Sequence, residues 1–555
     1  MTFVLQKIVD YGQVAATERF AEANTETAKA VLEEAGRIAS EVIEPSRRDS
    51  DLNPSRLENG VVRTPPSVHT AYRAIADGGW VGLAADADFG GMGLPQTLNV
   101  AVNEMLSAAC PALQVKSLLS QGQIEALEHH ASDELKALYL PKLNSGEWSG
   151  TMNLTEPQAG SDIGALTSQA VANGDGTWAI TGQKIYISWG DSDLVENICH
   201  LVLARTPDAP AGVKGISLFM VPKTLVHSDG SLGQANSLKV VSLEHKMGLH
   251  GSPTAVMQFD GAQGWLVGEE RGGMAAMFTM MNNARLGVGA QGIGVAEAAY
   301  QNAVAYARER RQGKVGGLGT IIEHPDVKRM LATMKAEIFA ARAIALSCAV
   351  AIDMAVATGK PEWKARAALL TPIAKSFGTD VGWRVADMGV QIHGGMGYVE
   401  ETGAAQYLRD VRISQIYEGT NGIQAIDLVG RKLADGGEAA FRLIDEIEST
   451  AEAARKQFPK LGEAVWSSAE TLRETTEWMV AADMDDRLAG ASDFLNAFAR
   501  VLGGWFHLTA AVQDDDCTKL ANVYAARVLP LAEAHLTMAR ASGVDLKELN
   551  SDDFL

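Results

Sequence analysis

Residues 412–430 read Arg-Ile-Ser-Gln-Ile-Tyr-Glu-Gly-Thr-Asn-Gly-Ile-Gln-Ala-Ile-Asp-Leu-Val-Gly. Apolar residues in and just after the second half of this stretch lie three to four positions apart, which predicts the buried face of a helix. They are Ile423, Ile426, Val429 and Leu433. Thr420 or Asn421 can cap the first turn of that helix. The stretch therefore predicts a loop, carrying Glu418, that leads into a buried helix.

Glu418 is flanked by Ile416, Tyr417 and Gly419, so its carboxylate can be partly stripped of water. Loss of water raises the proton affinity of a carboxylate, whereas nearby amides of a helix N-terminus lower it. A carboxylate in such a place is a candidate general base for an unactivated C–H bond. The same residues also fit an ordinary capping charge at a helix start, so the residues alone leave both roles open.

Several motifs in this sequence resemble those of the acyl-CoA dehydrogenase family. Residues 417–420 (Tyr-Glu-Gly-Thr) and 391–398 (Gln-Ile-His-Gly-Gly-Met-Gly-Tyr) resemble the catalytic C-terminal region of the family. Residues 155–162 (Thr-Glu-Pro-Gln-Ala-Gly-Ser-Asp) resemble its flavin-contacting turn, and residues 182–188 resemble the strand beside the flavin ring. Residues 308–314 resemble its basic turn near the cofactor pyrophosphate. Each motif alone is weak, but their shared order along the chain makes the resemblance specific.

The resemblance implies an FAD-dependent enzyme that removes two hydrogens across the Cα–Cβ bond of an acyl-CoA and gives the trans-2-enoyl-CoA. In that reaction Glu418 takes the α-proton and the flavin N5 takes the β-hydride. The backbone N–H of the same Glu polarises the thioester carbonyl, because the developing enolate oxygen needs hydrogen bonds. Electrons then pass to an electron-transfer flavoprotein. The expected setting is fatty acid β-oxidation and lipid metabolism.

Three residues are expected against the flavin ring by resemblance: Thr155, Tyr186 and Ser188. A hydroxyl suits this place, because it can donate or accept by rotating. The family usually has Trp where Tyr186 stands and Thr where Ser188 stands. The residue types alone also fit ordinary strand hydroxyls.

The remaining cofactor contacts are also implied by resemblance. Arg310 is expected at the pyrophosphate, because a guanidinium binds two phosphate oxygens in one plane. Gln391, Gly394 and Gly395 match positions near the adenosine half of FAD, and Thr420 is a further expected contact. In the family the contacts of the Gln-Gly-Gly group come from a neighbouring subunit, which implies an oligomer.

Ser161 is expected both among the cofactor contacts and near the CoA pantetheine of the substrate. Arg285 is expected near the CoA end of the substrate tunnel. Tyr417 and Glu418 complete the expected substrate contacts. No metal site is expected. His393, in a Gly-rich loop, is expected to be packed or hydrogen-bonded, and the polar group around His245 and His250 lacks metal-ligand spacing. Arg409 and Asp410 are expected in structural ion pairs.

The composition excludes some partners. The chain has 555 residues and a formal net charge of −20, which argues against nucleic acid and against an anionic membrane surface. Its four cysteines lack CxxC spacing and are interpreted as reduced thiols. The apolar run near residues 340–357 contains Arg342 and Asp353, so it suits a buried helix better than a membrane span. No secretory signal is recognised, and a cytoplasmic enzyme is expected.

The pattern of periodicities predicts a mainly α protein with a central β domain. An N-terminal helical domain is expected over 1–146 and a β domain, a small antiparallel barrel or sandwich, over 147–267. A C-terminal four-helix bundle carrying the catalytic residues is expected over 268–434, and an extra helical domain over 440–555. This extension resembles longer bacterial members that act on 3-methylmercaptopropionyl-CoA or on a broad range of fatty acyl-CoA thioesters.

Two other functions stay open. An acyl-CoA oxidase would keep the flavin and let oxygen reoxidise it. A DNA-binding relative without efficient dehydrogenation is disfavoured, because the extension has about twice as many acids as bases. The extension is expected to occupy the surface that shorter relatives use for tetramer pairing, which predicts a homodimer. The sequence does not define the length of the acyl chain.

Overall fold

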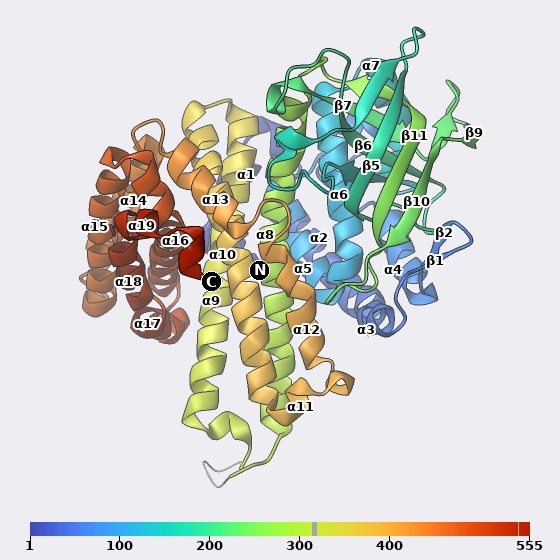
Figure 1. The fold of residues 1–555 in the computed structure, drawn as a ribbon. Helices are drawn as coiled ribbons and strands as arrows, with labels where there is room; N and C mark the ends of the chain where they lie inside the picture. The colour runs from blue at the N-terminus through green and yellow to red at the C-terminus, as the bar shows by residue number, and fades with distance from the viewer. Residues whose placement is uncertain (314–318, 542, 555) are drawn as a thin grey trace. The chain divides into compact units, whose positions relative to one another are not determined.

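The structure, a computed structural model, describes residues 1–313, 319–541 and 543–554. Helices dominate up to Asn144, strands run from Trp148 to Val267, and helices resume at Gly273 (Figure 1). The predicted order of helices, then strands, then helices is therefore confirmed. The extension is also helical, as predicted.

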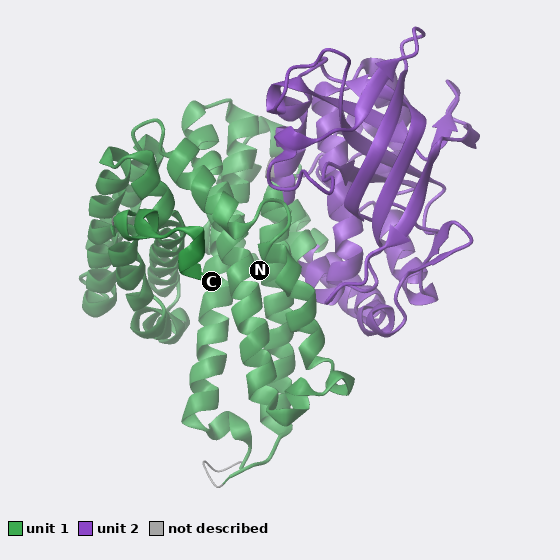
Figure 2. Cartoon of the chain, in the orientation of Figure 1, with its two compact units in different colours: residues 1–31, 95–104, 285–555 green, residues 32–94, 105–284 purple. Residues whose placement is uncertain are grey.

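The chain folds into two compact units (Figure 2). Unit 1 consists of residues 1–31, 95–104 and 285–555, and unit 2 of residues 32–94 and 105–284. These units cut across the four predicted segments, so the four-part division stays a prediction.

Unit 2 contains a small closed β structure with helices packed beside it. Its main sheet comprises β3 (Trp148–Asn153), β4 (Gln169–Ala172), β5 (Trp178–Ser188), β6 (Asn197–Arg205), β7 (Ile216–Pro222), β10 (Leu238–Leu243) and β11 (Thr254–Val267). The strand order is β10-β11-β5-β4-β6-β3, and β7 pairs with both β11 and β6, which closes a ring. Two small ribbons join β1 (Arg56–Glu58) to β2 (Val61–Arg63) and β8 (Thr224–Val226) to β9 (Leu232–Ala235).

The predicted barrel is thus confirmed, but it is not wholly antiparallel. β3 runs parallel to β6, and so does β4. Alternate residues of the strands form an apolar core inside the ring, which includes Ile180, Val202, Phe219 and Phe259, all at most 1% exposed. Period-two burial of this kind is what the alternating sequence pattern predicts.

Helices of unit 2 cover one side of β3. The helices that lie wholly in the unit are α3 (Glu44–Leu52), α4 (Pro66–Asp77), α6 (Pro111–His130) and α7 (Asp133–Asn144). Three helices cross the boundary of the two units: α2 (Thr25–Ile38), α5 (Gln96–Ala109) and α8 (Gly273–Glu309). α6 is buried nearly all round, because it packs on both β3 and α7.

Unit 1 contains the predicted bundle. The C-terminal part of α8 contacts α9 (Pro325–Thr358) through the Glu297–Arg342 ion pair and approaches α10 (Pro361–His393) closely at Gly289. The shorter α12 (Ala404–Val411) packs on α10 (Figure 1). Prolines at the first turns of α9 and α10 fit positions where the missing N–H costs nothing. Smaller helices of the unit are α1 (Gly12–Ala15), α11 (Gly395–Tyr398) and α13 (Asn421–Asp427).

α9 is the one described helix that is long and apolar enough to cross a membrane. Of the most apolar 18-residue stretch in that helix, 78% is buried inside the protein. Arg342 of this helix binds Glu104 and Glu297 through its guanidinium, at 2.5 and 2.7 Å. These contacts agree with the predicted buried core helix.

The extension packs on the bundle. It comprises α14 (Glu438–Ala454), α15 (Pro459–Ala481), α16 (Met484–Gln513), α17 (Thr518–Arg527), α18 (Pro530–Ala539) and α19 (Val544–Glu548). α16 and α17 lie against α9, and α16 also contacts α13. A Cβ at Gly503 would lie 2.1 Å from the Tyr524 hydroxyl and 2.8 Å from the Ala340 Cβ. The interface of α9, α16 and α17 therefore requires a glycine at this position.

Candidate active site

Glu418 lies on the loop between a 3-10 turn (Arg412–Gln415) and α13, as the sequence predicts. Its φ angle is +55°, and that of Gly419 is +82°. Two successive residues in the left-handed region are uncommon, and the first has a Cβ. A residue persists in such a conformation only where its surroundings hold it.

Two side chains hold this turn by its carbonyl groups. The Gln424 amide, one turn into α13, donates to the carbonyl oxygens of Glu418 and Gly419, at 3.2 and 3.3 Å. The Lys375 ammonium, from α10, donates to the Gly419 carbonyl at 2.8 Å and to the Asn421 side-chain oxygen at 2.9 Å. The backbone of the candidate base is therefore anchored from two helices.

The first turn of α13 is capped by Thr420. Its hydroxyl accepts a hydrogen bond from the backbone N–H of Ile423 at 3.2 Å. Asn421, the other predicted cap, has a different role, because its side-chain amide donates to Asp380 at 2.7 Å. Thr420 and Asn421 thus both fix the junction between the turn and the helix.

Two buried cations act on the Glu418 carboxylate. Burial raises the pKa of Glu418 above its usual value, and the charges of Arg285 and Lys375 oppose that rise. Arg285 is 3% exposed on α8, and its Nη2 would lie 3.7 Å from a Cβ at Gly419. Glu418 itself keeps some exposed surface, so the carboxylate is partly buried but still reachable. This combination suits a general base.

Lys375 is fully buried, and burial lowers its pKa to about 7, while the charges of Glu418 and Asp380 oppose that fall. The side chain of Tyr417 is held as well, because its hydroxyl donates to the side-chain oxygen of Gln291 on α8. Burial raises the pKa of Tyr417, and the neighbouring Glu418 adds to the effect. Tyr417 is therefore a neutral donor beside the base.

The predicted buried face of α13 is partly wrong. Ile426 is 44% exposed, whereas Gln424 and Asp427 are buried. The π-type turn over Leu428–Lys432 follows α13 and changes the phase of the helix, so Ile426 does not share a face with the residues after the turn. Val429 and Leu433 are buried as predicted.

Asp427 is buried because it binds Arg285, at 3.2 Å from Nη1. Its second oxygen binds the Nε of Arg431 at 2.6 Å. Arg285, expected near the CoA end of the substrate tunnel, is thus an interior residue of unit 1 whose nearest acid is Asp427. Its contact with substrate stays a prediction.

In unit 2 the predicted flavin turn is clamped to β5. The Ile185 backbone N–H donates to the carbonyl of Thr155 at 2.9 Å. The Lys184 ammonium donates to the Leu154 carbonyl at 3.2 Å and to the Glu156 carboxylate at 2.8 Å. Both side chains of this ion pair are almost fully buried. The structure therefore brings Thr155 next to the strand that carries Tyr186 and Ser188.

Glu156 organises the rest of that turn. Its carboxylate accepts hydrogen bonds from the backbone N–H and the hydroxyl of both Thr167 and Ser168, and from the Gln158 amide. Burial opposes its ionisation, but the Lys184 charge and these donors outweigh burial and lower the pKa of Glu156 to about 2. The carboxylate is thus a fixed structural anion.

The predicted flavin-contacting side chains lie at the end of β5. Tyr186 has a φ angle of +58° and is 62% exposed, which is unusual for a large aromatic residue in a strand. Ser188 is half-buried opposite Thr254 of β11. Ser161 is exposed on the clamped turn. A ring, hydroxyls and a turn with fixed backbone are therefore available on unit 2.

Arg310 and the Gln391 loop meet at one end of the bundle in unit 1. Arg310 follows α8 directly, and Tyr306 of that helix stacks on His393 with ring centroids 4.3 Å apart. Gln391, Gly394 and Gly395 are exposed beside this stack. A Cβ at either glycine would meet no atom within 4 Å, so the backbone there is open to a ligand. Lys314 of the basic turn lies outside the described residues.

This group is far from Glu418. From Arg285 to the end of α8 at Glu309 the helix rises through 24 residues, or about 36 Å. The structure therefore places the predicted residues of unit 1 at two separate locations. Arg285, Tyr417, Glu418 and Thr420 form one, and the group around Arg310 forms the other.

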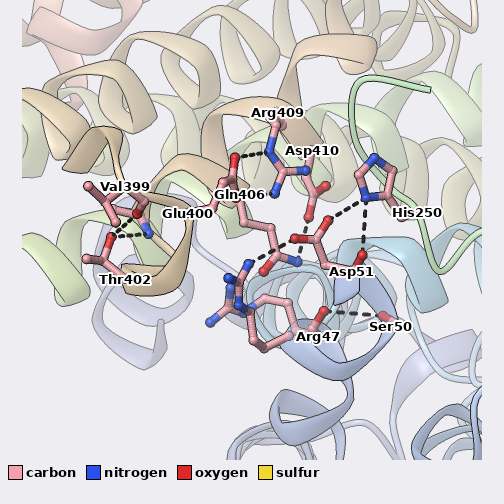
Figure 3. A network of polar contacts seen from close by, with 12 residues as sticks. Arg47, Ser50, Asp51, His250, Val399, Glu400, Thr402, Gln406, Arg409 and Asp410 are labelled. Carbon is pink, nitrogen blue, oxygen red and sulfur yellow. Dashed lines mark hydrogen bonds and ion pairs between the residues drawn. The ribbon is translucent and has the colours of Figure 1, made fainter. Parts of the chain in front are cut away.

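Three of the polar residues expected to be structural, His393, His250 and Arg409, have that role. The His393 Nδ1 donates to the Gly389 carbonyl at 2.7 Å, and its Nε2 is hydrogen-bonded to the Asn302 side chain at 2.9 Å. Figure 3 shows His250 bound to Asp51, at 2.8 Å, and Arg409 bound to Glu400, at 2.9 Å. Within the described ranges no group of three His, Cys, Asp or Glu residues is arranged to hold a metal ion.

Four important side chains were not found from the sequence: Glu156, Lys184, Lys375 and Asp427. Each is a charged residue in an otherwise apolar or motif-bearing stretch, such as Lys375 within Leu-Leu-Thr-Pro-Ile-Ala-Lys-Ser-Phe. The sequence did contain a signal for them: a single charged residue at a position where a buried side chain is expected. A buried charge must be paired, so such a residue indicates a partner elsewhere in the fold.

Comparison with known proteins identifies family segments along most of the chain. The N-terminal domain of acyl-CoA dehydrogenases matches residues 25–147, the middle domain residues 151–262, and the C-terminal domain residues 271–433. A further family, described as acetyl-CoA dehydrogenase C-terminal like, matches residues 443–550 in the extension.

Relatives that this chain matches over most of their length are also found. The chain is 45% identical over 522 residues to 3-methylmercaptopropionyl-CoA dehydrogenase of Ruegeria pomeroyi, covering 91% of this chain and 88% of the relative. It is 37% identical to the broad-specificity linear acyl-CoA dehydrogenase FadE5 of Mycobacterium tuberculosis, covering 77% and 74%. An acyl-CoA dehydrogenase from Bacillus anthracis, solved with FAD, has the same fold, with a TM-score of 0.73 at 20% identity over 96% of this chain and 90% of that one.

Proposed function

The chain belongs to the acyl-CoA dehydrogenase family of oxidoreductases, and we propose that it dehydrogenates an acyl-CoA between Cα and Cβ with Glu418 as the base. The observation that carries this proposal is the Glu418 turn. A carboxylate with a raised pKa stands on a backbone conformation that two side chains hold in place. A motif match gives the residue type, whereas this geometry gives a group that can accept a proton from carbon.

Glu418 would act through both its side chain and its backbone. Its carboxylate takes the α-proton, and its raised pKa brings the proton affinity closer to the working pH, which favours transfer. Its backbone N–H can donate to the thioester oxygen, where negative charge develops. Because the Glu418 and Gly419 carbonyls are already engaged by Gln424 and Lys375, the turn that follows this N–H is held before the substrate arrives.

FAD is the cofactor of this family, and the residues present fit it. When bound, it supplies the acceptor for the β-hydride. Thr155 and Ser188 offer hydroxyls to a flavin edge, and the exposed ring of Tyr186 offers a flat apolar wall. The clamp between Glu156 and Lys184 holds the turn that carries Thr155 and Ser161.

We assign the Arg310 group to the distal half of FAD. Arg310 offers a planar pair of donors for phosphate oxygens, and the open backbone at Gly394 and Gly395 allows close approach to a nucleotide. Gln391 adds a side-chain amide, and Thr420 is the remaining assigned cofactor contact. The separation of about 36 Å along α8 exceeds the span of one dinucleotide, so this group would serve the FAD of a second copy of the chain.

The substrate is proposed from the relatives. We infer a 3-methylmercaptopropionyl-CoA or a linear fatty acyl-CoA, with Ser161 near the pantetheine, Arg285 near the CoA end of the tunnel and Tyr417 beside the base. Electrons would pass to an electron-transfer flavoprotein, by resemblance to the family. The enzyme would work in the cytoplasm.

The test is anaerobic mixing of the flavoprotein with a panel of acyl-CoA thioesters, followed by the loss of flavin absorbance. We expect 3-methylmercaptopropionyl-CoA or linear fatty acyl-CoA thioesters to reduce the flavin, and free CoA to leave it oxidised. Turnover with an electron-transfer flavoprotein is then compared with peroxide formation in air. Predominant peroxide would favour an acyl-CoA oxidase, and salt-sensitive duplex binding without flavin reduction would favour a DNA-binding relative.

A further inference from the structure

We propose that Asp427 is a positioning residue for the base: it binds Arg285, so that this guanidinium does not form a tight ion pair with Glu418. The inference rests on the proposed function of Glu418. It extends that proposal to a residue of α13 that does not contact the substrate.

The geometry makes Arg285 a shared cation. Its side chain is 4% exposed and that of Asp427 2% exposed, with 3.2 Å between Nη1 and Oδ2. Its Nη2 is directed toward the Gly419 turn, since it would lie 3.7 Å from a Cβ there. Its Nε has no hydrogen-bond partner among the residues that the structure describes. A buried guanidinium with spare donors therefore stands between Asp427 and the loop that carries Glu418.

Other charges around this cluster do not replace Asp427. α10 contributes Lys375 and Asp380, and Asp380 is engaged by the Asn421 and Gln415 amides. The turn after α13 contributes Arg431 and Lys432, whose positive charges repel Arg285.

Tyr417, beside the base, is neutral below its raised pKa. Among the groups that face Arg285, the acids are therefore Asp427 and Glu418.

Buried arginine does not lose its proton, so it needs an anion nearby. While Asp427 supplies one, Arg285 lowers the pKa of Glu418 only in part, and burial still raises it. With Asp427 neutralised, Glu418 becomes the remaining acid that can compensate Arg285. A direct ion pair would lower the pKa of the base and turn its carboxylate toward α8.

The decisive variant is Asp427→Asn, and the readout is the pH profile of flavin reduction by acyl-CoA. We expect the acid limb to move down by about 1 pH unit, the effect of an opposite charge at close range. The rate at the wild-type optimum should fall by up to about tenfold, since one pKa unit is a tenfold change in the proton-transfer equilibrium and the rate follows that equilibrium at most in full. Infrared difference titration of the carboxyl, referenced to Glu418→Gln, measures the same pKa without turnover.

The matched control is Arg431→Gln, which removes the other guanidinium on Asp427 from a side chain that is 56% exposed. Its acid limb should stay in place. A second control tests the route: Asp427→Asn should have no effect on the acid limb when introduced into Arg285→Gln. If Asp427→Asn does not fold, Asp427→Ser leaves room for a water beside Arg285 and should give the same shift.

An unchanged acid limb in folded Asp427→Asn would overturn the inference, and so would an equal shift in the Arg285→Gln background. Both results require a wild-type protein whose flavin is reduced by acyl-CoA. If no thioester reduces the wild type, the proposed function itself fails, and the infrared titration of Glu418 still decides the role of Asp427.

Discussion

The ammonium of Lys375 lies 2.8 Å from the carbonyl oxygen of Gly419, 44 positions further along the chain. This contact joins the middle of a bundle helix to the turn that carries the candidate base. Lys375 is fully buried, and its second acceptor, the Asn421 side chain, belongs to the same turn. A buried lysine that binds two uncharged oxygens is costly to stability, and these two contacts indicate that it positions the turn.

Replacing Lys375 by Met should impair the base in two ways. The Gly419 carbonyl loses its donor, and a small misplacement of a catalytic group can cost about 10²-fold in rate. Loss of the positive charge also raises the pKa of Glu418, so the acid limb of the pH profile should move to higher pH. Stopped-flow flavin reduction over a pH series measures both effects.

Lys116→Met is the matched control for that variant. Lys116 is an equally buried lysine in unit 2, bound to the Ser149 hydroxyl at 2.7 Å, and burial lowers its pKa to about 7 as well. Its loss should reduce thermal stability and leave the acid limb in place. Identical pH profiles for the Lys375 variant and the wild type would contradict the positioning role.

Replacing Glu418 by Gln should stop the reaction and spare the cofactor. The amide cannot accept the α-proton, so flavin reduction by acyl-CoA should slow by at least about 10²–10⁴-fold. FAD should remain bound, and the protein should stay yellow. Glu400→Gln, which breaks an ion pair with Arg409, should retain the wild-type rate. Near-normal reduction in the Glu418 variant would move the base to another residue.

The wild-type enzyme should lose activity on acidification at a pH above the usual 4.5 of a glutamate. Burial raises the pKa of Glu418, and Arg285 and Lys375 compensate for it only in part. The reaction needs the ionised carboxylate, so the rate falls as pH decreases through this raised pKa. The acid limb of kcat/KM reports it. An acid limb at or below 4.5 would mean that the two cations outweigh burial.

Replacing Glu156 by Gln should destabilise the flavin turn. Breaking a buried ion pair leaves Lys184 without its anion and costs about 3–5 kcal/mol in the free energy of unfolding. The folded pKa of Glu156, about 2, is below the ordinary 4.5, so the stabilisation is complete above pH 4.5. It is lost as the pH falls toward 2. Urea unfolding at neutral and acidic pH should therefore show the difference from wild type shrinking in acid.

Glu34→Gln is a suitable control for the Glu156 variant. Glu34 binds Arg37 within one exposed helical turn, and exposed pairs contribute little to stability. No measurable change is expected at either pH. A Glu156 variant as stable as the wild type, with FAD still bound, would exclude the clamp as a determinant of the turn.

Light scattering should show a homodimer, with twice the 59.0 kDa mass of one chain. α16 and α17 of the extension cover α9, so that face of the bundle is already occupied within the chain. Under the proposed assignment of the Arg310 group to FAD, its separation from Glu418 implies that a second copy completes each FAD site. A tetramer would show that pairing uses another face, and a monomer that binds FAD tightly would contradict the assignment of Arg310.

Local patterns in the sequence were sufficient for much of the fold. Helical periodicity predicted the long helices of the bundle, and alternation predicted the strands around the core of β5 and β11. Neighbouring residues also predicted that Glu418 lies on a loop and that Thr420 can cap the helix after it. These features depend on contacts between residues a few positions apart, which the order of residues determines directly.

Other features depended on packing. Ile426 was expected inside and is exposed, whereas Asp427 is buried because Arg285, 142 positions away, supplies its counter-charge. A π-type turn follows Asp427 and has more residues per turn than an α-helix. The three-to-four-residue spacing that predicts a buried face therefore does not hold across it. A local sequence pattern cannot predict the burial of Asp427, because its partner Arg285 is on another helix.

The sequence by itself determined which residue types stand on the reactive loop and that this loop enters a helix, because such preferences arise from adjacent backbone and side-chain groups. Only the tertiary structure decided that Lys375 holds Gly419, that Asp427 binds Arg285 and that Glu156 is paired with Lys184. Each of these pairs joins separate elements, and burial, which makes an unpaired charge costly, selects the partner after those elements have packed.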